Sequence, residues 1–97
     1  MPLVALTADG KKVAAITGSA SGSVGAGSTG TISVPLGMGV LQKKLGVLGV
    51  ASISVSGATV YLVSFAASAD SVDVTVYNPG TAAATVTVSV TALVVGV

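Results

Sequence analysis

The chain has 97 residues and a net charge of +1; 52% of its residues are hydrophobic and only 7% are charged. Soluble domains usually contain about 25% charged residues, so we expect a surface of Ser, Thr, Gly and Ala, or one covered by other subunits. His and Cys are absent, which excludes a Ser-His-Asp triad, a thiolate metal site and a disulfide framework. We expect a single domain over residues 1–97, with no enzymatic activity, no cofactor and no small-molecule substrate.

The first nine residues predict an extended N-terminal arm. Residues 1–6 are apolar and lack the basic start of a signal peptide, and we can assign them no alternating partner within the domain. Six extended residues reach about 20 Å, far enough to add a strand to a neighbouring chain. We therefore predict that Leu3, Val4 and Leu6 anchor this arm on another chain. The alternative is an ordinary first strand of the same domain.

Residues 10–35 predict two strands separated by small residues. Asp9-Gly10 is a turn signal before a strand at residues 12–17, and another strand at 31–34 closes at Pro35. Residues 18–30 are either a flexible loop or, at 20–24, a strand that a neighbouring backbone approaches closely, and we favour the strand. Residues 25–30 match G-x-G-x-x-G, but a strand pattern follows where a dinucleotide site needs a helix, so we reject nucleotide binding.

Residues 45–69 form an uncharged stretch that is long enough to span a bilayer. Serine and glycine interrupt it, and residues 50–55 alternate like a strand, so we predict strands and no membrane contact. Residues 36–41 are ambiguous, and residues 40–48 are compatible with one helical turn or a short strand. The most apolar strand is expected at 59–65, with Tyr61, Val63 and Phe65 on one side. We interpret Phe65 as core, and the tyrosines at positions 61 and 77 as rim or interface.

Residues 71–95 predict a β-hairpin, the most regular part of the chain. Both arms, residues 72–77 and 85–91, alternate valine with polar residues, which is typical of strands with one buried face. The segment Asn78-Pro79-Gly80-Thr81 joins them, and Pro79 followed by Gly80 favours a type II turn.

The few charged residues favour structural roles. The lysines form two pairs, Lys11-Lys12 and Lys43-Lys44, which are too few for a surface that reads phosphates. We interpret both pairs as solvated loop residues and expect no nucleic-acid partner. Asp70 and Asp73 could pair for acid/base chemistry or calcium binding. Their position at a strand start favours hydrogen bonds to nearby backbone N–H groups, so we expect no metal site.

Turn signals recur about every 8–12 residues and delimit about six to eight short strands. This pattern is typical of an all-β fold, and we predict a small antiparallel β-sandwich, jelly-roll or immunoglobulin-like. A monomer of this composition would expose apolar patches and unprotected strand edges. We therefore predict a homo-oligomer, with a trimer preferred over a dimer.

Two stretches carry a pattern beyond simple alternation. AGSTGTISVP, at residues 26–35, joins small residues to a strand that ends in proline, and ADSVDVTVYNP, at residues 69–79, is a strand that leads into a final hairpin. Both resemble strands of small β-sandwich virion proteins of tailed bacteriophages, which include capsid decoration (cement) proteins and domains of head and tail fibres. The resemblance covers about a fifth of the chain. It transfers no catalytic or binding residue.

The resemblance implies a structural virion protein that is made in the host cytoplasm and located on the capsid surface. There it would bind the major capsid protein and stabilise the phage head, and the small size of the chain suits decoration better than a fibre tip. Two alternatives remain, because a fold alone does not decide a function. One is a fibre or adhesion module that binds a host surface, and the other is a coat, filament or membrane-associated subunit.

Overall fold

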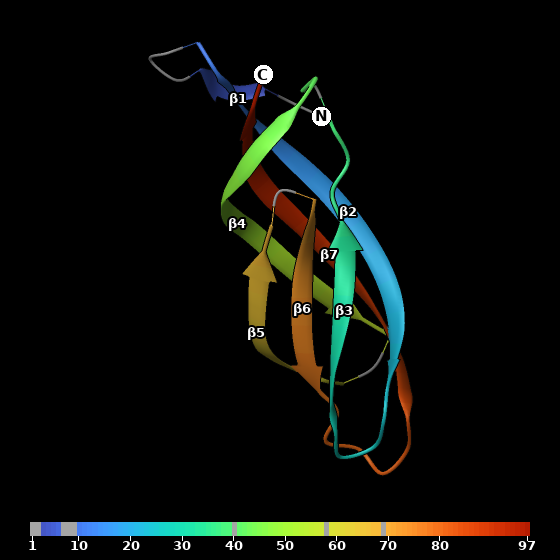
Figure 1. The fold of residues 1–97 in the computed structure, drawn as a ribbon. Helices are drawn as coiled ribbons and strands as arrows, with labels where there is room; N and C mark the ends of the chain where they lie inside the picture. The colour runs from blue at the N-terminus through green and yellow to red at the C-terminus, as the bar shows by residue number, and fades with distance from the viewer. Residues whose placement is uncertain (1–2, 7–9, 40, 58, 69) are drawn as a thin grey trace.

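The computed structural model describes residues 3–6, 10–39, 41–57, 59–68 and 70–97 (Figure 1), and for residues 3–6 it describes the backbone alone. All regular structure in these ranges is β, as predicted. The seven strands are β1 (Leu3–Leu6), β2 (Lys12–Val24), β3 (Thr29–Pro35), β4 (Lys44–Ser56), β5 (Tyr61–Ala67), β6 (Ser71–Tyr77) and β7 (Ala84–Gly96). Three of them, β2, β4 and β7, have 13 residues each and are longer than the short strands we expected.

The strands form two antiparallel sheets, with the orders β1-β2-β7-β4 and β3-β6-β5. The sheets pack face to face as an elongated sandwich of 51 × 18 × 16 Å (Figure 1). From β2 to β5 the chain alternates between the two sheets. β3 pairs with β6 in one sheet and β2 pairs with β7 in the other, so the β3–β6 pair lies within the β2–β7 pair along the sequence. β1 adds a fourth strand beside β2 at one edge of the larger sheet. The predicted small antiparallel β-sandwich is confirmed.

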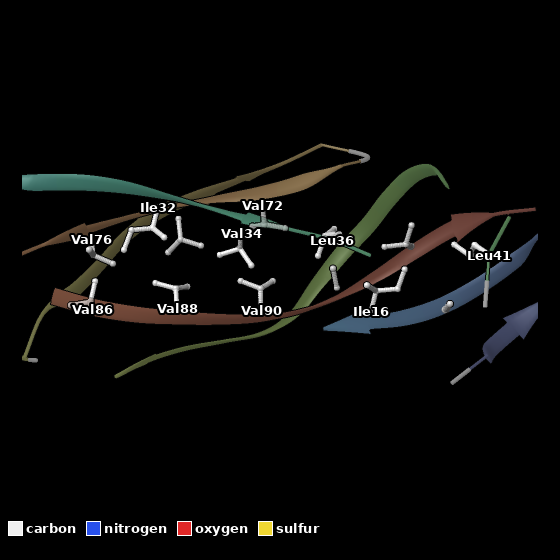
Figure 2. Packing of buried hydrophobic residues seen from close by; sticks show 14 of the residues in the cluster. Ile16, Ile32, Val34, Leu36, Leu41, Val72, Val76, Val86, Val88 and Val90 are labelled. Carbon is white, nitrogen blue, oxygen red and sulfur yellow. The ribbon is translucent and has the colours of Figure 1, made fainter. Parts of the chain in front are cut away.

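The core lies between β6 and β7. Val72, Val74 and Val76 of β6 are fully buried and belong to one cluster with the alternating apolar residues of β7. Figure 2 shows Val72 and Val76 facing β7 across the sandwich. Branched side chains suit such a pleated surface, and burying each valine contributes roughly 1.5–3 kcal/mol. The buried residues of β7 are Val86, Val88, Val90, Ala92 and Val94.

The predicted hairpin at residues 71–95 is wrong, although both of its strands are present. β6 and β7 belong to different sheets, because their valine faces pack against each other instead of lying side by side in one sheet. The connection between them therefore crosses from sheet to sheet. The type II turn is also wrong, since Gly80 is not among the glycines with positive φ, which are Gly10, Gly27, Gly39 and Gly57.

The small residues after position 17 form the second half of β2, so the predicted strand there is confirmed. Gly18 lies directly against the carbonyl oxygen of Pro35, and a Cβ on Gly22 would contact the side chain of Ile32. These glycines let β3 approach β2 closely. The G-x-G-x-x-G segment at residues 25–30 covers a turn, with a 3.2 Å hydrogen bond from the Ser28 N–H to the Gly25 carbonyl, and then the start of β3.

Of the ambiguous segment at residues 40–48, residues 44–48 belong to the first half of β4, an irregular edge strand. Its pairing with β7 shifts register at three places: between Lys44 and Gly46, Val47 and Gly49, and Val50 and Ser52. Each shift inserts an extra residue, so that every third residue faces the core in this half of the strand. A simple alternation is therefore absent from this part of the sequence. Within the described ranges, no helix is long and apolar enough to cross a membrane.

Candidate interaction surface

β5 is the outer strand of the three-stranded sheet, and it is exposed along its whole length. Its large apolar side chains are half or more exposed: Tyr61 60%, Leu62 50%, Val63 55% and Phe65 50%. The interpretation of Phe65 as core is therefore wrong. We call these four residues the β5 surface.

Tyr61, Val63 and Phe65 do not share one side of β5, so that prediction is wrong. The pairing of β5 with β6 shifts between Leu62 and Ser64, which breaks the alternation at Val63. Leu62 lies opposite Val76, and Phe65 lies opposite Val74. Because directly opposed residues of antiparallel strands share a face, Leu62 and Phe65 both lie on the inner face of the sheet.

The exposure of these two inner residues shows that the sandwich is open on one side. β3, the other outer strand of the same sheet, buries its inner residues Ile32 and Val34 to 5% and 0% exposure. There the glycines of β2 allow a close approach. On the opposite side, β4 presents the branched residues Ile53 and Val55, which are only partly buried. The core is therefore closed between β2 and β3 but not between β4 and β5.

The open side carries no charge. The sequence between Leu45 and Ala67 contains no Lys, Arg, Asp or Glu. Lys44 marks the start of this range, and the prediction that it is a solvated loop residue is wrong. It begins β4 with a side chain only 9% exposed, and its Nζ donates to the Leu36 carbonyl at 2.6 Å and lies 3.8 Å from the Asp70 carboxylate.

The turn before β6 is stabilised by a serine. The Ser68 hydroxyl accepts hydrogen bonds from the backbone N–H groups of Asp70 at 3.4 Å and Ser71 at 3.3 Å. The prediction that the side chains of Asp70 and Asp73 bond these N–H groups is wrong, because Ser68 is the acceptor. Asp70 instead points its carboxylate toward Lys44, with 93% of the side chain exposed, and Asp73 lies on the exposed outer face of β6.

Paired hydroxyl groups lie on the outer face of each sheet. Cross-strand pairs join Thr17 to Thr91 at 3.0 Å, Ser21 to Thr87 at 2.9 Å, and Thr31 to Thr75 at 3.0 Å. Such pairs stabilise a sheet and satisfy each other's hydrogen bonds. Ser and Thr therefore provide the polar surface that charged residues provide in most soluble proteins, whereas the β5 surface has neither charge nor hydroxyl cover apart from the Tyr61 phenol.

The predicted anchor residues Leu3, Val4 and Leu6 lie in β1, which pairs antiparallel with β2 at the outer edge of the four-stranded sheet. The expectation that this stretch has no partner strand within the domain is wrong, because Leu6 lies opposite Lys12 and Leu3 opposite Ala14. The backbone thus follows the alternative of an ordinary first strand. Contact of these side chains with another chain stays a prediction, and residues 7–9 of the predicted arm lie outside the described residues.

The described part of the chain contains neither a pocket nor a group of three side chains suited to hold a metal ion. No family model, no curated protein and no solved structure matches the chain. The feature that calls for a functional explanation is therefore the β5 surface.

Proposed function

We propose that the protein is a structural virion protein, a capsid decoration protein that acts as a homo-oligomer on the surface of a phage head. The single observation that carries the proposal is the uncharged apolar β5 surface on the open side of the sandwich. An apolar surface of this kind is typical of a chain that works within an assembly. The two stretches at residues 26–35 and 69–79, with their resemblance to phage virion modules, point to a capsid as that assembly.

The distribution of polar groups supports the same proposal. The outer faces carry paired hydroxyls, which tolerate solvent on the outside of a particle. β1 lies at the outer edge of the four-stranded sheet, and we expect its predicted anchors Leu3, Val4 and Leu6 to contact a neighbouring capsid subunit. The partners in this proposal are other copies of the chain and the major capsid protein.

Particle fractionation tests the proposal. We expect gradient-purified particles from the source culture to contain the chain in a fixed ratio to the major capsid protein. Recovery of the chain in the membrane fraction would support the coat or membrane-associated alternative instead. Binding of the purified chain to a glycan array, without binding to particles, would support an adhesion module.

Deletion of residues 1–8 tests the role of the N-terminal strand. We expect the truncated protein to keep its strand-rich circular dichroism and to lose attachment to particles. β1 is an edge strand of four residues, so its loss removes only a few backbone hydrogen bonds, each worth about 1 kcal/mol. The melting temperature should therefore fall by less than about 15 °C.

A triple substitution separates the side chains of β1 from its backbone. Replacing Leu3, Val4 and Leu6 by alanine keeps the strand but removes the three predicted anchors. If these side chains bind a capsid subunit, the triple variant loses attachment as the deletion does. Full attachment of the triple variant would contradict the anchor prediction, and failure of the deletion to fold would show that β1 belongs to the core.

A further inference from the structure

We infer that the β5 surface is the contact through which copies of this chain associate, so that the β5 surface of one copy covers that of the next. The inference rests on the proposed function for its premise that the chain works as an oligomer. It goes further by naming the surface through which the copies bind and the partner that binds there. This partner is the same strand of another copy.

The edge of β5 lacks the features that protect other strand edges of the molecule. Outer strands usually carry a lysine, a proline, a bulged backbone or a very short length, which prevent pairing with other chains. β1 has four residues, β3 ends in Pro35, and β4 begins with Lys44 and shifts register three times. The sequence of β5, YLVSFAA, has no charged residue and no proline, and its pairing shifts only once.

The lack of charge on the β5 surface favours another copy of the chain as its binding partner. An acidic or basic partner would find no opposite charge between Leu45 and Ala67. A symmetric contact brings the same patch of both copies together, which is unfavourable for a patch of one charge but favourable for an uncharged apolar one. One such contact covers the β5 surfaces of all participating copies at once.

The geometry of the open side allows this arrangement. β5 already pairs antiparallel with β6, so a copy related by a two-fold axis beside β5 continues the sheet in the same antiparallel sense. Leu62 and Phe65, which face the uncovered inner side next to β4, then come together with their equivalents and complete the core on that side. A three-fold axis at the same place gathers three β5 surfaces and covers the same residues.

A charge on the inner face of β5 tests the inference. In a single chain Phe65 is half exposed, so the lysine of Phe65→Lys can keep its ammonium group in water and the domain still folds. In the oligomer, the lysines introduced in the different copies lie within the same apolar contact, where their like charges repel. We expect the wild-type protein to sediment as an oligomer at about 10 µM, and we expect Phe65→Lys to weaken self-association about 100-fold or more and to sediment as a monomer.

The matched control is Ser33→Lys, which places the same charge on an exposed position of β3, the other outer strand of the sheet. This variant should keep the oligomeric state of the wild type, and circular dichroism should show the same strand content in all three proteins. A wild-type protein that is monomeric would overturn the inference. So would a Phe65→Lys variant with the wild-type oligomeric state.

A chemical measurement covers the case in which Phe65→Lys does not fold. The chain has no cysteine, so a single substitution gives one reactive thiol. Val63→Cys, at the register shift of β5, should react with a maleimide at least about 10-fold more slowly in the concentrated protein than after dilution to the monomer. Ser33→Cys should react at similar rates in both. Equal rates at position 63 would contradict a β5 contact.

These results are separable from the proposed function. An oligomer that does not bind particles would retain the β5 contact and reject the decoration role. A monomeric chain that binds particles would reject the β5 contact and retain the decoration role.

Discussion

Replacing Gly18 by alanine should lower the free energy of unfolding by about 3 kcal/mol, because the new methyl group has no space. A Cβ at this position collides with the carbonyl oxygen of Pro35 and comes within 3.3 Å of the Val34 side chain. The carbonyl belongs to the backbone of β3 and cannot rotate away as a side chain would. The sheets must therefore separate locally, and the fully buried Val34 loses part of its packing.

The measurement is urea denaturation followed by circular dichroism, in which the melting temperature should also fall by roughly 15 °C. Gly46→Ala is the matched control, because Gly46 lies in β4 with no atom within 4 Å of an added Cβ and with no positive φ. We expect that variant to stay within about 0.5 kcal/mol of the wild type or to be slightly more stable. If Gly18→Ala behaves like the control, β2 and β3 do not approach as closely as described.

Replacing Asn78 by alanine should destabilise the protein by about 3 kcal/mol, through the loss of a buried hydrogen-bond network. Asn78 is only 3% exposed. Its Nδ2 donates to the carbonyl oxygens of Val24 at 3.1 Å and Ala82 at 2.9 Å, and its Oδ1 accepts from the Gly80 N–H at 2.9 Å. The side chain thus connects the end of β2, the end of β6 and the loop to β7. Alanine would leave the Val24 carbonyl without this bond in a buried position.

Two further variants define the origin of this effect. Thr81→Ala changes an exposed residue of the same connection and should alter the free energy of unfolding by less than about 0.5 kcal/mol. Asn78→Asp retains the acceptor for Gly80 but places a carboxylate against two carbonyl oxygens, so it should be at least as destabilising as alanine at pH 7. A mild Asn78→Asp effect would show that the Gly80 bond matters more than the two donated bonds.

The β5 strand shows why burial is harder to predict than secondary structure. Its length and apolar character identify a strand, and the structure confirms one at Tyr61–Ala67. Whether Phe65 is buried depends on a covering strand from the other sheet, and the residues around Phe65 carry no information about that distance. The register shift at Val63 is also invisible in the sequence, because it depends on the pairing with β6.

The N-terminal strand and β4 were difficult to predict from the sequence for related reasons. The pairing of β1 with β2 is short and shifts register between Leu3 and Ala5, so this segment shows no regular two-residue alternation. In β4, repeated bulges replace the two-residue period by one of three, so the first half of the strand resembles neither a regular strand nor a helix.

The sequence by itself determined the all-β class, the strands with alternating valines, and which faces of β6 and β7 are buried. Strand propensity and a two-residue period act within a few neighbouring residues, so they can be read locally. Only the tertiary structure decided that β6 and β7 lie in opposite sheets, since a hairpin and a crossing between sheets need the same alternating pattern. It also decided that the sandwich is closed at β3 and open at β5. That difference arises from how closely β2 and β4 let the second sheet approach, and the residues responsible, Gly18 and Gly22 of β2 and Ile53 and Val55 of β4, lie in the opposite sheet.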